Sequence, residues 1–346
     1  MPLVLVLTNP GDSTADRVSV ALRDRGAKVL RFDTAEFPLD CGIVGEYRND
    51  RETRTWILRN WGSCIDLEEV GSVWYRRPRQ FRVNPLLKQH EQTFALSEAA
   101  MAMGGMLRGL PCFWMNHPAA LAEAAYKPRQ LREAVNCGLR IPQTLITNDP
   151  GHAERFLKSM THGAVIKALG KATIKGSAED PVQPGIVMTS SVEAADISDF
   201  SQVRHTACLL QERIPKRFDL RITAVGDTLF PVAIHSQENP EAALDWRRAG
   251  PWLKHELVTL PAEVEDGLRR MLSTFNLHFA AIDMVLTPDN EHIFLEINPN
   301  GEWEWLERTI GPALSSTVAD TLIKFAHKEP RVGDAVSEPL PEGETS

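Results

Sequence analysis

The chain has 346 residues and a formal net charge of −8, from 38 lysines and arginines against 46 aspartates and glutamates. Hydrophobic residues make up 43% of the chain and charged residues 24%, which excludes a disordered or collagen-like chain. The acidic balance argues against a protein that coats nucleic acid, because phosphate backbones are bound by clustered Lys and Arg. At roughly 100–200 residues per domain, the length predicts two or three domains.

The five cysteines are odd in number and widely scattered, so the sequence predicts neither a disulfide framework nor a zinc site. The apolar start of the chain, from Met1 to Leu7, has no basic segment before it and no cleavage site after it. It therefore indicates a buried strand rather than a signal peptide. No uncharged apolar stretch approaches the roughly 20 residues that a membrane span needs. We expect a cytoplasmic protein with no membrane partner.

Residues 1–112 are expected to form an α/β domain. Strands are predicted at Leu3–Leu7 and Val29–Phe32, with a helix between them that runs to Leu22. Strand, helix and strand at this spacing are typical of a crossover unit in a parallel sheet. Two more strands, over 55–58 and 73–75, and a long helix over 87–108 follow in the same domain.

Residues 113–207 are expected to form a central domain. Helices are predicted on either side of the pair Lys127 and Pro128, because proline suits the first turn of a helix. Strands are predicted at Ile141–Thr147, Gly163–Leu169 and Gly185–Thr189. The loop Gly170–Pro184, which contains Lys171 and Lys175, is expected to fold over phosphates.

Residues 208–328 are expected to form a third domain. Its predicted strands cover 208–213, 218–225, 229–235, 280–286 and 291–297, and its predicted helices cover 262–275 and 312–327. The tail 329–346 is rich in Pro, Gly and Glu and is expected to be disordered.

The strongest pattern for function lies in the last two predicted strands. If Asp289 and Asn290 form a two-residue turn, Asp283 faces Glu296 and Asn298 falls on the same face. Two facing carboxylates repel each other unless a cation lies between them. A set of hard oxygen donors suits Mg²⁺. The alternative is an exposed hairpin that carries acidic residues by chance.

Two lysines are candidates for phosphate binding. Lys167 lies inside the apolar strand 164–169, where an ammonium group is costly without a partner such as a phosphate. The alternative is a lysine that reaches past the sheet edge to water. Lys127 precedes Pro128 at a predicted helix start, where exposed N–H groups favour an anion. The chain contains neither a GxxxxGK[ST] nor a GxGxxG motif, which disfavours a P-loop or dinucleotide site.

A linker strand joins the second and third predicted domains over Cys208–Pro215. Pro215 interrupts its ladder, so free backbone groups are left to read the edge of an adenine. The alternative is a plain connection between domains.

These pieces together resemble the ATP-grasp superfamily. The resemblance rests on residues spread from the second predicted domain to the last strand: Asn116, Lys127, Gln130, Leu131, Gly138, Leu139, Pro142, Thr144, Lys167, Gln211, Glu212, Asp219, Leu220, Arg221, Asp283, Glu296, Ile297 and Asn298. Within the superfamily the chain looks like the graspetide, or microviridin-type, ligases that mature ribosomal peptides. That likeness rests on Val73–Pro78, on Asp245, Trp246 and Arg247, and on 298–301 followed by Trp303 and Trp305.

The resemblance implies an α/β (α+β) chain with the ATP-grasp fold, in which a pre-ATP-grasp domain precedes two lobes that enclose ATP. It also implies site roles, residue by residue. Lys127 and Lys167 would contact the ATP phosphates, and Gln211, Glu212 and Ile214 would lie at the adenine. Asp219 would touch ribose or substrate, and Arg221 would steady an acyl phosphate. Asp283, Glu296 and Asn298 would bind Mg²⁺.

The implied reaction activates Asp or Glu side chains of a precursor peptide with ATP and closes macrocyclic esters to Thr or Ser, or amides to Lys. The implied partners are a leader-bearing precursor peptide with an acidic, hydroxyl-rich core, and a second copy of the chain in a homodimer. Two alternatives stay open. One is a RimK-like ligase that joins amino acids or extends a peptide, and the other is a peptide-binding module with an inactive nucleotide site.

Overall fold

The computed structural model describes residues 1–49, 53–59, 63–170, 173–174, 185–249, 252–311 and 313–326. Lys171, Lys175, most of the predicted phosphate loop and the tail 329–346 lie outside the described residues. The chain forms two compact units, Asn116–Val318 and Met1–Met115 with the stretch from Ala319. No described helix is both long enough and apolar enough to cross a bilayer. The predicted mixed α/β class is confirmed, and the boundary at 207/208 stays a prediction.

The first unit is built on a four-stranded sheet whose order is β2-β1-β6-β7. Every pair in this sheet is parallel, as the strand, helix and strand pattern predicts. Its strands are β1 (Leu3–Thr8), β2 (Lys28–Phe32), β6 (Val70–Arg77) and β7 (Phe113–Met115), and its main helices are α1 (Ser13–Asp24) and α2 (Gln89–Arg108). Asp12 begins α1 by accepting a bond from the Ala15 N–H.

A small antiparallel sheet also belongs to this unit. It consists of β3 (Cys41–Tyr47), β4 (Thr53–Arg59) and β5 (Ser63–Asp66), in that order. Only β4 is predicted from the sequence. Gly42 and Gly45 interrupt the pattern of β3, because glycine weakens a strand signal.

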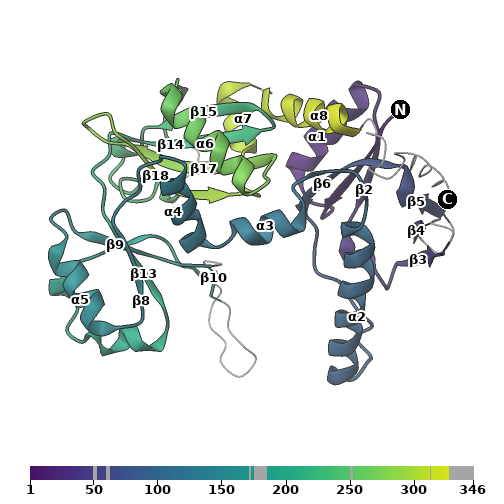
Figure 1. Ribbon diagram of the computed structural model, residues 1–346, viewed down its shortest axis with the longest axis horizontal. Coiled ribbons are helices and arrows are strands. Elements are labelled where there is room, and N and C mark those ends of the chain that lie inside the picture. The colour runs from purple at the N-terminus through teal and green to yellow at the C-terminus, as the bar shows by residue number, and fades with distance from the viewer. Residues whose placement is uncertain are drawn as a thin grey trace, which may run out of the picture. The chain divides into compact units, whose positions relative to one another are not determined.

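The second unit contains two larger antiparallel sheets (Figure 1). The first has the order β12-β9-β13-β8. Its strands are β8 (Thr144–Thr147), β9 (Ala164–Lys167), β12 (Ser190–Val192) and β13 (Cys208–Glu212), and α5 (Pro150–Ser159) packs on it. The predicted strand Gly185–Thr189 is too long. Strand β11 covers only Gly185–Ile186, where it pairs with β10 (Thr173–Ile174), and β12 begins beyond the predicted range.

The second of these sheets has five strands in the order β16-β15-β14-β17-β18. They are β14 (Phe218–Val225), β15 (Thr228–Ile234), β16 (His255–Leu257), β17 (Phe279–Leu286) and β18 (His292–Asn298). Three helices cover one face: α3 (Pro118–Ala124), α4 (Lys127–Asn136) and α6 (Ala262–Thr274) (Figure 1). Two more helices, α7 (Glu304–Ile310) and α8 (Ala313–Ala326), follow β18 along the chain.

Side chains alternate between the two faces of this sheet. Leu220 and Ile222 of β14 and Ile282 of β17 point into the core beneath the helices, which Leu268 and Met271 of α6 complete. The residues between them in sequence therefore point to the opposite face. That opposite face carries the polar residues that the sequence singles out.

The hairpin of β17 and β18 brings Asp283 opposite Glu296, as predicted, although the predicted turn is wrong. The loop has three residues rather than two, because Thr287 and Glu291 form the last backbone bond before it. Asn290 ends that loop in the left-handed region, at φ 62°. A β-bulge at Leu295 then adds one residue to β18 and restores the predicted register beyond it.

Candidate active site

Two adjoining pockets lie on the polar face of the five-stranded sheet. The larger has a volume of about 450 Å³ and the smaller about 100 Å³. They share Lys167, Thr189, Lys216, Leu244 and Leu295, so they form one continuous cleft. This cleft lies between the β9 sheet and the five-stranded sheet, and both sheets supply its walls.

The facing carboxylates of β17 and β18 open into the larger pocket, and each has a cationic partner. An Arg221 nitrogen donates to both Asp283 oxygens at 2.8 and 3.0 Å, and Lys127 Nζ lies 2.9 Å from a Glu296 oxygen. Burial, together with the nearby charge of Glu296, raises the pKa of Asp283 although Arg221 opposes this shift. Burial also opposes charge on Glu296, but Lys127 and Lys167 hold the pKa of that carboxyl below its ordinary value.

The donor set fits a hard divalent cation. Asp283 and Glu296 present carboxylate oxygens to the same pocket, and oxygen donors of this kind suit Mg²⁺. Among the described residues, no group of three or more His, Cys, Asp or Glu side chains could hold a metal by itself. Asn298 follows on the same strand, and its Oδ1 accepts a bond from the Asn300 N–H at 3.0 Å. A metal there would need further oxygens from a ligand such as a phosphate.

Lys167 differs from the other cations of the cleft. Four basic side chains line the larger pocket in the described structure, and three of them are paired with carboxylates: Lys127 with Glu296, Lys216 with Asp219, and Arg247 with Asp245. Lys167 instead donates to the neutral amide of Gln211 at 2.8 Å. Burial lowers the pKa of Lys167 to about 8, with Glu296 opposing this shift and Lys127 adding to it.

Gln211 is buried and orients Lys167 from β13. Its amide nitrogen donates to the Thr144 hydroxyl at 2.9 Å, which fixes the carboxamide so that its oxygen faces the lysine. The resemblance implies that Gln211 lies at the adenine. In the structure it lines the smaller pocket, its side chain bonds to Lys167, and its backbone pairs with β8 and β9.

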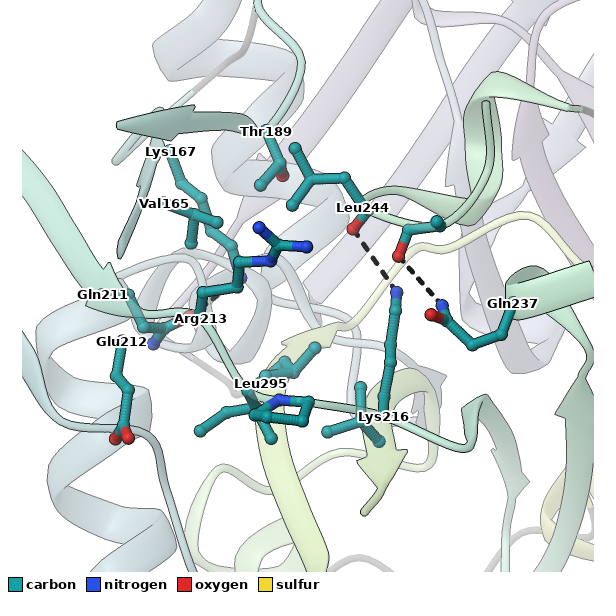
Figure 2. A pocket seen from close by; sticks show the side chains of 14 residues that line it. Val165, Lys167, Thr189, Gln211, Glu212, Arg213, Lys216, Gln237, Leu244 and Leu295 are labelled. Atoms are coloured by element: carbon teal, nitrogen blue, oxygen red, sulfur yellow. Dashed lines mark hydrogen bonds between the residues drawn. The ribbon is translucent and has the colours of Figure 1, made fainter. Parts of the chain in front are cut away.

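The smaller pocket is lined by both apolar and polar side chains. Val165, Ile214 and Leu295 supply its apolar side chains, and Glu212 of the linker strand lies beside them. The adenine contacts of this strand stay a prediction. The Glu212 N–H donates to the Gln143 carbonyl at 2.8 Å. Figure 2 shows Val165 and Lys167 on one side of this pocket and Lys216 on the other.

Lys216 is a site residue that the sequence analysis misses. Its ammonium group donates to both Asp219 oxygens, at 2.8 and 2.9 Å, and reaches the Leu244 carbonyl at 3.4 Å (Figure 2). The Ser236 hydroxyl also donates to Asp219. Asp219, predicted at ribose or substrate, therefore lies on the pocket wall within an internal network. The signal available in the sequence is a lysine beside Pro215 at the start of a buried strand.

A short segment with Asp245, Trp246 and Arg247 forms another wall of the larger pocket. Asp245 accepts two bonds from the Arg247 guanidinium, at 2.8 and 2.7 Å, and these bonds hold the pKa of Arg247 above its ordinary value. The Trp246 ring lies 5.9 Å from the guanidinium carbon of Arg221 and 5.1 Å from the Trp305 ring. Trp303 is fully buried.

Comparisons with known proteins find a matching family and similar structures. The sequence model of the MvdD pre-ATP grasp domain family matches residues 3–122. A RiPP-associated ATP-grasp ligase from Chryseobacterium gregarium, solved with ADP and a leader and core peptide, has a TM-score of 0.85 and 27% identity, over 94% of this chain and 97% of that one.

Two macrocyclases from Microcystis aeruginosa MRC have similar structures. MdnC, solved with the precursor peptide MdnA, has a TM-score of 0.80 and 30% identity, over 94% of this chain and 100% of its own. MdnB has a TM-score of 0.76 and 32% identity, over 93% of this chain and 99% of its own. The fold predicted from the motifs, with an N-terminal pre-ATP-grasp part, is confirmed by these matches.

Proposed function

We infer the reaction from the premise that this chain belongs to the family of ATP-grasp peptide ligases that includes the macrocyclases MdnB and MdnC. The proposed reaction uses ATP to activate Asp or Glu side chains of a ribosomally made precursor peptide as acyl phosphates. A Thr or Ser hydroxyl, or a Lys amine, of the same peptide then closes a macrocyclic ester or amide. ADP and phosphate are the other products.

One observation carries this proposal: a buried lysine that is bonded to a neutral amide lies in the same cleft as a facing pair of carboxylates. Lys167 contributes the positive charge, and its neutral partner Gln211 leaves the charge available to a phosphate. Asp283 and Glu296 would hold Mg²⁺, which offsets negative charge on the phosphates when it is bound. The smaller pocket, where Val165, Ile214 and Leu295 supply apolar contacts beside polar groups, is the proposed adenine site.

The residues of this chain bind and orient rather than form covalent intermediates. A substrate carboxylate oxygen attacks the terminal phosphorus, and the bond from that phosphorus to ADP breaks. Lys127 and Lys167 would hold the phosphates in line for this attack. Arg221, buried beside Trp246, would steady the acyl phosphate. The hydroxyl or amine next attacks the acyl carbon, loses its proton, and phosphate leaves.

The proposed partner is a precursor peptide with a leader and an acidic, hydroxyl-rich core. This rests on the peptide complexes of the ligase from Chryseobacterium gregarium and of MdnC. Arg247 is half-exposed on the pocket wall and would face acidic side chains of such a core. Assembly of this chain as a homodimer stays a prediction.

The test uses a peptide, encoded beside the gene, that carries repeated Thr or Ser and Asp or Glu residues, with its side-chain carboxylates labelled with a heavy oxygen isotope. Incubation with ATP and Mg²⁺ should remove one water per bond and release phosphate that carries one labelled oxygen per bond. Glu296→Gln should abolish this turnover with no loss of fold. Glu291→Gln, in the same hairpin and paired with Arg140, is the matched control and should stay active.

The same assay separates the alternatives. A RimK-like ligase would release ADP with free glutamate and would add mass to a peptide instead of removing water. A peptide-binding module with an inactive nucleotide site would release no ADP with any acceptor. Unlabelled phosphate together with an unchanged peptide would contradict the acyl phosphate.

A further inference from the structure

The outer side of β18 is held by a side chain instead of a strand. β18 is the last strand of its sheet, so half of its backbone groups have no neighbouring strand to bond. Gln130 of α4 is buried and takes that place at Ile297. Its amide oxygen accepts from the Ile297 N–H at 3.1 Å, and its amide nitrogen donates to the Ile297 carbonyl at 3.0 Å. The same nitrogen donates to the Ala124 carbonyl at 2.6 Å, which anchors the carboxamide.

The residue that Gln130 holds lies between two proposed metal ligands. Ile297 separates Glu296 from Asn298, and its own side chain packs into the core. The bulge at Leu295 immediately precedes Glu296 in the sequence. Without the bulge, the three-residue loop would set Leu295 opposite Asp283 and would turn Glu296 towards the core face, because a shift of one residue reverses every side chain.

The outer contacts of β18 enclose the bulge. Before it, the Phe294 N–H donates to the Arg140 carbonyl at 2.8 Å, and after it the Ile297 N–H donates to Gln130. Groups on the same side of a regular strand lie two residues apart, whereas these lie three apart in sequence. The two contacts are therefore compatible with a bulge between them and incompatible with a regular strand. They fix the extra residue at Leu295.

We propose that Gln130 is a positioning residue for the metal and phosphate site. By pairing with the Ile297 backbone, its carboxamide keeps the bulge in place and so keeps Glu296 facing Asp283. Its consequence for ligand binding rests on the function proposed above. Gln130 does not touch the substrate, so its effect passes through the direction of the Glu296 carboxylate.

The test compares Gln130→Met, which keeps the length of the side chain but cannot form these bonds, with wild-type protein. The first readout is the affinity for ADP with and without Mg²⁺. The gain in ADP affinity that Mg²⁺ provides should fall by about 10- to 100-fold, as is typical when a residue that orients a ligand is lost. The affinity for ADP without Mg²⁺ should fall less, because Val165 and Ile214, which lie outside β18, still line the smaller pocket.

The second readout is hydrogen exchange of the Ile297 amide, which should accelerate in Gln130→Met. The matched control is Gln92→Met. Gln92 also donates its amide to backbone carbonyls, those of Pro85 and Leu87, but it belongs to the other unit of the chain. Gln92→Met should leave the Mg²⁺ gain and the Ile297 exchange unchanged.

Three results would contradict the proposal or show that the proposed function itself is wrong. An unchanged Mg²⁺ gain in Gln130→Met contradicts it. An equal loss of ADP affinity with and without Mg²⁺, with a lower melting temperature, shows general destabilisation and also contradicts it. If wild-type protein binds no ADP, the proposed function fails. In that case, unchanged exchange of the Ile297 amide in Gln130→Met would still contradict the proposed role of Gln130. Should Gln130→Met not fold, Gln130→Asn draws the same carboxamide back by one methylene and should give the same losses.

Discussion

Asp283 and Glu296 face each other across neighbouring strands, yet each carboxylate is bonded to a different cation, Arg221 and Lys127. These two ion pairs offset the electrostatic repulsion between the carboxylates without a bound metal. A divalent cation is therefore not needed to hold the ligand-free hairpin together. Its proposed role is in binding phosphate, and the two cations are placed to share that role.

The pair of Arg221 and Asp283 should behave as a buried ion pair, because the two side chains are only 7% and 14% exposed. Arg221→Met should lower the free energy of unfolding by about 3–5 kcal/mol, since it leaves a buried carboxylate without its cation. The double variant with Asp283→Asn should recover much of this loss. Denaturant unfolding of the wild type, both single variants and the double variant measures the coupling.

The loss in Arg221→Met should also depend on pH. With its pKa raised by burial, the unpaired Asp283 takes up a proton in the folded state more readily than in the unfolded state. The destabilisation should therefore shrink as pH falls and grow as pH rises through the pKa of that carboxyl. If Arg221→Met loses the same free energy of unfolding at low and at neutral pH, the unpaired charge of Asp283 is not the cause of the loss.

Nucleotide affinity should fall at alkaline pH because of Lys167. Its pKa of about 8 means that the free protein loses this charge as pH rises above 8, whereas a bound phosphate favours the charged form. The dissociation constant for ADP should rise towards about tenfold per pH unit above that value. Lys167→Arg should bind ADP with little dependence on pH, because a guanidinium stays charged. Identical pH profiles for the two proteins would refute the assignment.

The smaller pocket should be tested at Leu295, which lines both parts of the cleft, whereas its neighbour Glu296 lines only the larger part. Leu295→Ala should weaken ADP binding by about tenfold or more, since burying a leucine side chain is worth roughly 1.5–3 kcal/mol. Binding of inorganic tripolyphosphate should be unaffected, because it has no base. Leu257→Ala, on exposed β16, is the control and should alter neither affinity. Equal losses for both ligands would place the adenine elsewhere.

The sequence predicts correctly that the two carboxylates face each other, but it does not predict the turn and the bulge that connect them. The two-residue turn at Asp289 and Asn290 is wrong by one residue, and the bulge at Leu295 is absent from the prediction. These two errors cancel at Asp283 and Glu296. A bulge has no sequence signal of its own here, because it depends on backbone bonds from other elements, such as those to Ile297.

Other parts of the site depend on tertiary contacts in the same way. A lysine in an apolar strand points to Lys167, but nothing in the sequence shows that Gln211 would be its partner. Lys216 and Gln130 act through bonds to residues that are distant or on another element, so spacing along the chain cannot predict them. The apolar pattern does predict both strands. β14 alternates apolar and polar residues, and β17 is an apolar run interrupted only by Asp283.

The central claim is that Asp283 and Glu296 hold a divalent cation against a nucleotide in this cleft. The most direct measurement is a crystal structure of the protein with ADP and Mn²⁺, with the ion located by its anomalous scattering. We expect a peak between the two carboxylates, with the nucleotide phosphates beside Lys167 and the base against Leu295. An ion bound elsewhere, with Asp283 still bonded only to Arg221 and the base outside the smaller pocket, would contradict this assignment of the metal and nucleotide site.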